Sequence, residues 1–128
     1  EPKWLDEGVI LAIHSKLAAE FGGKSGLRDA ALFEASLKRP VNKFLYENAS
    51  ISSLAAAYAY GLIKNHSFVD GNKRTGLAVM LTYLEIQGVT IQEQTGLDDL
   101  MVDIVESQEE HELLAKIVAE FLYELSII

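Results

Sequence analysis

The chain alternates between amphipathic stretches and stretches that are apolar on nearly every face. Residues 7–21 carry apolar side chains at three- and four-residue steps, which predicts a helix with one face against a core. Asp6 stands before this stretch as an N-cap candidate, and a glycine pair ends it. Asp29 is a second N-cap candidate. The helix that follows it is expected to be short, because a helix interior tolerates a proline poorly and Pro40 stands there.

Helical periodicity fails between residues 41 and 49, which are expected to form a loop or a small flap hairpin. This stretch contains three large apolar side chains, Phe44, Leu45 and Tyr46. If they are exposed, they are candidates for docking a target protein. The alternative, that they fold back onto the core, is equally compatible with the pattern.

Two stretches are apolar on nearly every face and predict two buried helices. Residues 53–65 include small alanines that let neighbouring helices approach, and residues 77–84 form the second stretch. The serines at positions 50, 52 and 53 are expected to supply the N-cap of the first of these helices. Two later stretches, 97–105 and 113–125, again show helical periodicity. The pattern therefore predicts an all-α fold, a compact bundle of about six helices in a single domain that spans residues 1–128.

Composition and charge exclude several classes of protein. The 128 residues include no cysteine, so neither a disulfide framework nor a thiolate metal site is available. Eleven basic and nineteen acidic side chains give a net charge of -8, which disfavours binding to nucleic acid. The longest uncharged apolar stretch, 54–63, is shorter than the roughly 20 residues of a membrane span. We therefore expect a cytoplasmic protein with no membrane segment and no direct contact with nucleic acid.

The two buried helices are separated by HSFVDGNKRTG, residues 66–76, which is rich in polar groups. The start of a helix presents unpaired N–H groups that favour an anion such as phosphate. Gly71 allows the backbone to approach a ligand closely, and Asn72 can cap the helix or donate to a phosphate oxygen. Lys73 and Arg74 add two cations. The turn is therefore a candidate phosphate-binding site.

The remaining residues of the turn suggest group transfer. A carboxylate beside phosphates is repelled unless a cation lies between them, so Asp70 predicts Mg²⁺. The imidazole of His66 can accept a proton from an attacking hydroxyl, and Phe68 is interpreted as an apolar anchor. His14 and His111 are interpreted as structural or solvent-facing. Each motif residue alone also has an ordinary structural explanation, and their clustering between two buried helices is what favours chemistry.

Other catalytic motifs are missing from the sequence. It contains no Walker A spacing, no H-E-x-x-H zinc pair and no G-x-S-x-G elbow. His66 and Asp70 could share a metal, but no third ligand is apparent. A zinc site is therefore disfavoured.

The turn resembles the motif of the Fic/Doc (Fido) family, His-x-Phe-x-Asp/Glu-Gly-Asn-Gly/Lys-Arg between two central helices. The matching positions are His66, Phe68, Asp70, Gly71, Asn72, Lys73 and Arg74. The segment FGGKSGLRDAALFEASLKRP and the small-residue helix before the motif are similar to death-on-curing (Doc) toxins, so the resemblance covers most of the chain. It implies the compact six-helix Fic core.

Two positions distinguish the branches of the family. Fic adenylyltransferases have glycine at the position of Lys73 and a second arginine at the position of Leu77. The Doc branch implies a toxin of a type II toxin–antitoxin system, a kinase that moves the γ-phosphate of ATP to a threonine of elongation factor Tu and blocks translation. Adenylyl transfer and a non-catalytic binding module are the alternatives.

Carried over by position, the resemblance assigns a role to each motif residue. His66 would be the general base, Asp70 the Mg²⁺ ligand, and residues 71–74 would bind the phosphates of ATP, while residues 41–46 would correspond to the flap that aligns the target. The [S/T]-x-x-x-E-[G/N] pattern of an inhibitory helix is missing from the sequence, and Leu77 would leave its glutamate without a partner. A Phd-like antitoxin, bound as a helix in a groove of the first helices, is therefore the expected partner.

Overall fold

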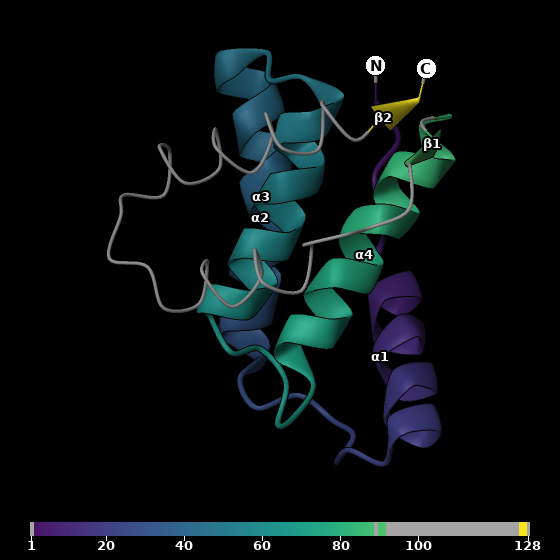
Figure 1. The fold of residues 1–128 in the computed structure, drawn as a ribbon. Coiled ribbons are helices and arrows are strands. Elements are labelled where there is room, and N and C mark those ends of the chain that lie inside the picture. The colour runs from purple at the N-terminus through teal and green to yellow at the C-terminus, as the bar shows by residue number, and fades with distance from the viewer. Residues whose placement is uncertain (1, 89, 92–125, 128) are drawn as a thin grey trace.

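The computed structural model describes residues 2–88, 90–91 and 126–127, which form four α-helices and one pair of short strands (Figure 1). The helices are α1 (Glu7–Phe21), α2 (Ala30–Glu47), α3 (Ile51–Lys64) and α4 (Asn72–Ile86). Strand β1 (Thr90–Ile91) pairs antiparallel with β2 (Ser126–Ile127), so that Thr90 lies opposite Ile127. The predicted all-α class agrees with these helices. The helices expected at 97–105 and 113–125 lie outside the described residues, so the count of six remains a prediction.

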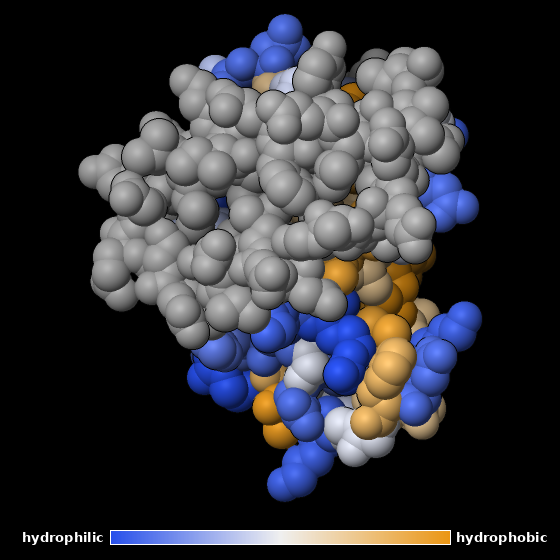
Figure 2. Space-filling view, in the orientation of Figure 1, coloured by the Kyte–Doolittle hydropathy of each residue, from blue (hydrophilic) through white to orange (hydrophobic). Residues whose placement is uncertain are grey.

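Helix α3 is the centre of the helical packing. It packs against α2 on one side and α4 on the other, and α1 packs against α4 (Figure 1). Every residue of α3 from Leu54 to Ile63 is buried, as predicted from its apolar pattern. Apolar surface is visible over α4 and the neighbouring part of α1 in the space-filling view (Figure 2). None of the helices in the described part of the chain is long and apolar enough to cross a lipid bilayer.

The close approach of α3 and α4 depends on a glycine. A Cβ atom added at Gly76 would lie 2.7 Å from Cγ1 of Ile63, closer than real Cβ contacts come. Gly76 is fully inside the α3–α4 contact and belongs to the second turn of α4. The first turn of α4, which carries the polar motif, is thereby held directly against the central helix.

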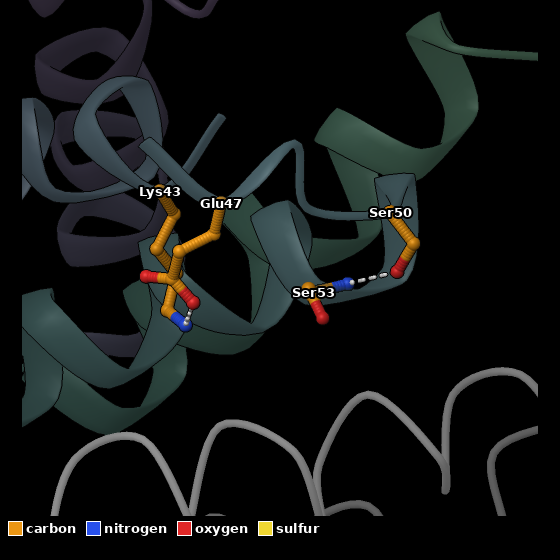
Figure 3. Close-up of polar contacts among 4 residues, drawn as sticks. All are labelled: Lys43, Glu47, Ser50 and Ser53. Atoms are coloured by element: carbon orange, nitrogen blue, oxygen red, sulfur yellow. Dashed lines mark hydrogen bonds and ion pairs between the residues drawn. The ribbon is translucent and has the colours of Figure 1, made fainter. Parts of the chain in front are cut away.

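The N-caps predicted for α1, α2 and α3 are confirmed. Asp6, Asp29 and Ser50 each accept a hydrogen bond from the backbone N–H three residues later, at 2.9, 3.0 and 3.2 Å (Figure 3 shows Ser50). Each bond satisfies one of the N–H groups that have no partner within the helix. Gly22 ends α1 in the left-handed conformation at φ 82°, as the glycine pair predicted.

The predicted loop or hairpin at 41–49 is wrong, as is the expectation of a helix that stops at Pro40. Helix α2 continues through Pro40 to Glu47 and ends at Asn48, whose φ of 50° is left-handed. Asparagine tolerates this conformation better than most residues. The helix therefore ends at a capping asparagine eight residues beyond the proline.

Tertiary packing explains why α2 survives the proline. Pro40 is buried, although its ring removes one helical hydrogen bond and disfavours the helix interior by about 3 kcal/mol. One turn further on, the ring of Phe44 packs edge-on against Trp4 with centroids 5.9 Å apart. Nζ of Lys43 lies 3.7 Å from Oε1 of Glu47, a pair at helical spacing (Figure 3). The burial of Pro40 and the contact of Phe44 with Trp4 are formed only in the folded chain, so local sequence rules miss them.

Two buried tyrosines complete the core near α1. The hydroxyl of Tyr58 accepts a hydrogen bond from the backbone N–H of Leu5 at 3.1 Å, and its ring centroid is 5.0 Å from that of Tyr83. Burial raises the pKa of both Tyr58 and Tyr83, so both hydroxyls stay protonated at neutral pH. They contribute packing, not charge.

Candidate active site

The polar motif forms the turn between α3 and α4 and the first turn of α4. Asn65 is the C-cap of α3, and Gly71 is the N-cap of α4 in the left-handed conformation at φ 75°. His66 also has a left-handed backbone, at φ 47°, which is uncommon for a residue with a side chain. The chain therefore reverses between two buried helices through two left-handed residues, one of them the candidate base.

Phe68 lies in the core under this turn. It is 1% exposed, its ring stacks on His14 with centroids 3.9 Å apart and planes 7° apart, and it meets the ring of Phe33 edge-on at 5.6 Å. His14 is buried on α1, and its Nε2 lies 2.8 Å from the carbonyl oxygen of Asp70. Of the two alternatives for His14, the structure shows a structural role. Its contacts tie the turn to α1.

The side chain of Asn72 closes the turn on itself. Its Oδ1 accepts a hydrogen bond from the backbone N–H of Phe68 at 2.8 Å, and its Nδ2 donates to the carbonyl of the same residue at 2.9 Å. With both amide atoms paired to the backbone of Phe68, the side chain of Asn72 stabilises the turn. The alternative that Asn72 caps α4 is wrong, because Gly71 is the N-cap and the start of this helix has no side-chain cap. The structure instead gives Asn72 a positioning contact that the sequence did not predict, and its backbone N–H remains at the start of α4.

Three backbone N–H groups are available at the start of α4. The first hydrogen bond along this helix runs from the N–H of Thr75 to the carbonyl of Gly71, at 2.9 Å. The N–H groups of Asn72, Lys73 and Arg74 precede it and have no partner within the helix. Together with the helix dipole they favour an anion at this end of α4.

The cations of the motif are exposed beside these N–H groups. Lys73 is exposed and has no ion-pair partner among the described residues. The guanidinium of Arg74 lies over the ring of Phe21, 4.2 Å from its centroid, a cation–π contact that orients its planar fork. Both charges are therefore available at the surface without being neutralised by a carboxylate in the described part of the protein.

Asp70 is the acidic group of the site. It is exposed, and its Oδ1 accepts a hydrogen bond from the N–H of Gly71 at 2.9 Å. Its Oδ2 faces Gly23 after α1, where an added Cβ would lie 3.1 Å away. The described residues contain no group of three or more His, Cys, Asp or Glu that could hold a metal by themselves. One carboxylate with a free oxygen still suits Mg²⁺, which keeps several waters and takes phosphate oxygens as ligands.

A small cavity lies behind the first turn of α4. It has a volume of about 10 Å³ and is lined partly by His14, Asp70, Gly71 and Thr75. The hydroxyl of Thr75 is buried and has no hydrogen-bond partner in the described residues. The space is that of about one water molecule. The cavity is therefore too small for a nucleotide, whereas His66, Lys73 and Arg74 are exposed at the surface.

The structure does not bring the candidate flap residues to the motif. Phe44 is half-buried, whereas Leu45 is 66% and Tyr46 is 83% exposed. They lie in the last turn of α2, beside the start of α3, and the motif follows the end of α3 (Figure 1). Because α3 has 14 residues, its two ends are roughly 20 Å apart. A target-docking role for these three residues remains a prediction.

Sequence reasoning missed one residue that contacts the backbone of the turn. Arg28 precedes α2, and its guanidinium donates hydrogen bonds to the carbonyls of Asn65 and His66. It belongs to the Doc-like segment recognised from the sequence, but no local pattern distinguished it from an exposed cation. Its contact with the motif appears only when two loops far apart in the chain are placed together.

Comparison with known proteins identifies the family of the chain. The Fic/DOC family matches residues 4–84. The chain is 35% identical over 107 residues to Toxin Doc of Mycolicibacterium smegmatis, covering 80% of each chain. It is 31% identical over 94 residues to Protein kinase doc of Escherichia phage P1, covering 73% of this chain and 75% of that protein. The chain therefore belongs to the Fic/DOC family, in its Doc toxin branch.

Proposed function

We propose that the protein is a toxin with protein kinase activity, which transfers the γ-phosphate of ATP to a hydroxyl group of a target protein. A threonine of elongation factor Tu is the proposed acceptor, so that the reaction would block translation. The observation that carries the proposal is the motif from His66 to Arg74, in the turn before α4 and on the first turn of that helix, with Lys73 and Leu77 at the two positions that distinguish the branches. The names of the two relatives, a toxin and a protein kinase, support it.

His66 would accept the proton of the target hydroxyl. Its side chain is exposed and forms no hydrogen bond with another described residue, so both ring nitrogens are available to a substrate. A positioned general base typically contributes about 10²- to 10⁴-fold to a rate. The left-handed backbone of His66 fixes the direction in which the ring leaves the turn.

Binding and charge stabilisation would come from the start of α4. The free N–H groups of its first turn, with Lys73 and Arg74, would bind the phosphate oxygens of ATP and stabilise the charge that develops during transfer. Asp70 would hold Mg²⁺ through its free Oδ2 together with phosphate oxygens. When bound, Mg²⁺ supplies neutralising charge between the carboxylate and the phosphates.

Lys73 and Leu77 favour phosphoryl transfer over adenylyl transfer. A lysine where adenylyltransferases have glycine would crowd the usual nucleotide pose in the phosphate site. Leu77 is half-buried and packs against the core, so no second arginine contributes to the site from this position. Adenylyl transfer remains the second candidate reaction because the rest of the motif is shared.

A Phd-like antitoxin is the proposed partner. The described structure has an open groove of about 310 Å³ between the start of α1 and the middle of α2. Its lining includes the apolar Leu37 and Val41 and the charged Glu7, Glu34 and Lys38. A groove with both apolar and charged side chains suits a short amphipathic helix.

The reaction can be tested with two forms of labelled ATP. The protein is incubated with elongation factor Tu and either γ-labelled or α-labelled ATP, with His66→Ala as the matched control. The proposal expects label on the elongation factor from the γ position only, and none with His66→Ala. Label from the α position would show adenylyl transfer. No label from either form, with no Mg-nucleotide binding by calorimetry, would favour a non-catalytic binding module.

A further inference from the structure

The backbone of the candidate base has a conformation that needs support. His66 has φ 47°, and its N–H donates to the carbonyl of Ile63 at 3.2 Å. A left-handed residue at the end of a helix is usually a glycine, because a Cβ atom crowds the carbonyl that follows it. The carbonyl groups of Asn65 and His66 also lie beyond the last turn of α3 and need donors from outside the helix.

Arg28 provides those donors. Its Nε donates to the carbonyl oxygen of His66 at 2.6 Å, and its Nη2 donates to the carbonyl oxygen of Asn65 at 2.8 Å. The rigid guanidinium fork thus bridges two consecutive carbonyls, and both bonds are strengthened by its positive charge. A lysine has one flexible ammonium group and cannot reproduce this planar bridge.

The backbone around Arg28 continues the same contact. The N–H of Arg28 donates to the carbonyl of Ser67 at 2.8 Å, and the N–H of Val69 donates to the carbonyl of Gly26 at 3.1 Å. Leu27 and Phe68 form an isolated antiparallel bridge between these bonds. Gly26–Arg28 therefore pairs with the turn like a short strand, and the Arg28 side chain extends this pairing to Asn65 and His66.

We propose that Arg28 is a positioning residue that fixes the left-handed backbone of His66 and so aims its imidazole at the acceptor hydroxyl. It would act through His66 and would not touch the substrate. This inference rests on the proposed function, because it assumes that His66 transfers a proton. A general base displaced by about 1 Å can lose roughly 10²-fold in rate, so the expected effect is on kcat.

The test compares Arg28→Ala and Arg28→Lys with Lys16→Ala, which removes the same charge from an exposed site on α1. Phosphate transfer from ATP is measured to give kcat and KM separately. The Cα and Cβ chemical shifts of His66, which report its backbone conformation, are measured by NMR on the same proteins. This second readout does not need activity, so it stands even if the wild-type protein transfers no phosphate.

The expected result for Arg28→Ala is a kcat about 10- to 100-fold lower, a KM for ATP within about twofold of wild type, and His66 shifts displaced from their left-handed values. Arg28→Lys should lie between wild type and Arg28→Ala, and Lys16→Ala should match wild type in both readouts.

Three outcomes would overturn the inference. Unchanged His66 shifts in Arg28→Ala would show that the guanidinium does not hold this backbone. A raised KM with unchanged kcat would make Arg28 a nucleotide ligand instead. If Arg28→Ala fails to fold, Arg28→Lys becomes the deciding variant. An Arg28→Lys protein with the kcat and the His66 shifts of wild type would show that the guanidinium fork is not needed.

Discussion

At the scale of single residues, the motif divides into side chains that build the turn and side chains that remain available. Asn72 pairs with the backbone of Phe68, and His14 supports the turn from α1. His66 and Lys73 are exposed and form no hydrogen bond or ion pair with other described residues through their side chains. The available groups are the ones that the proposed reaction needs for proton transfer and phosphate binding.

At position 66, the left-handed backbone favours glycine, whereas the proposed reaction needs the imidazole of His66. His66→Ala and His66→Gly both remove the imidazole, so both should lose phosphate transfer. Glycine fits φ 47° without the crowding of a Cβ atom, so His66→Gly should have a free energy of unfolding higher than His66→Ala by about 1 kcal/mol. Urea unfolding of the two variants measures the difference.

The two variants form a matched pair, because each lacks the imidazole and they differ only in the Cβ atom. An alanine variant that is as stable as the glycine variant, or more stable, would mean that His66 does not adopt the left-handed conformation. Retained phosphate transfer in either variant would remove His66 from the mechanism.

At the scale of secondary-structure elements, the site depends on how closely α4 approaches α3. Gly76→Ala should lower the free energy of unfolding by about 1–3 kcal/mol, because the new Cβ would lie 2.7 Å from Cγ1 of Ile63. In an Ile63→Ala background, Cγ1 of Ile63 no longer blocks the new Cβ. Gly76→Ala should then raise the free energy of unfolding by up to about 1 kcal/mol, since alanine is the better helix former.

A double-mutant cycle measured by denaturant unfolding tests this reversal of sign. If Gly76→Ala has the same effect in both backgrounds, Ile63 does not limit the approach of the two helices. The cycle uses only stability, so its result does not depend on the proposed reaction.

Helices were predictable from the sequence where local rules decide their ends. The three N-caps and Gly22 act within a few residues along the chain, and their sequence signals were sufficient. Helix α2 was not predictable beyond Pro40, because its continuation depends on the burial of Pro40 and on the contact between Phe44 and Trp4. Local propensity favours a stop there, and tertiary packing outweighs it.

At the scale of the whole molecule, the fold brings two loops together that are about 40 residues apart in the chain. The segment from Gly26 to Asp29 pairs with the turn from Asn65 to Val69, and α1 contributes His14 beneath it. The motif itself was predictable because it is contiguous in sequence. Its supporting residues were not predictable, because a lone arginine or histidine carries no signal of a distant backbone contact.

The site faces outward at one end of the central helix, and the groove proposed for the antitoxin lies between the start of α1 and the middle of α2. The family assignment covers residues 4–84, which include all four described helices except the last two residues of α4. The residues matched by the family therefore include the complete motif and its supporting contacts. The chemistry proposed for the motif can be tested directly on the modified target protein.

The most direct test is the mass of purified elongation factor Tu after incubation with the protein, ATP and Mg²⁺. The account predicts a gain equal to one phosphoryl group, located on a threonine by fragmentation, and no gain when His66→Ala replaces the wild-type protein. A gain equal to one adenylyl group, or a phosphoryl gain that persists with His66→Ala, would contradict it.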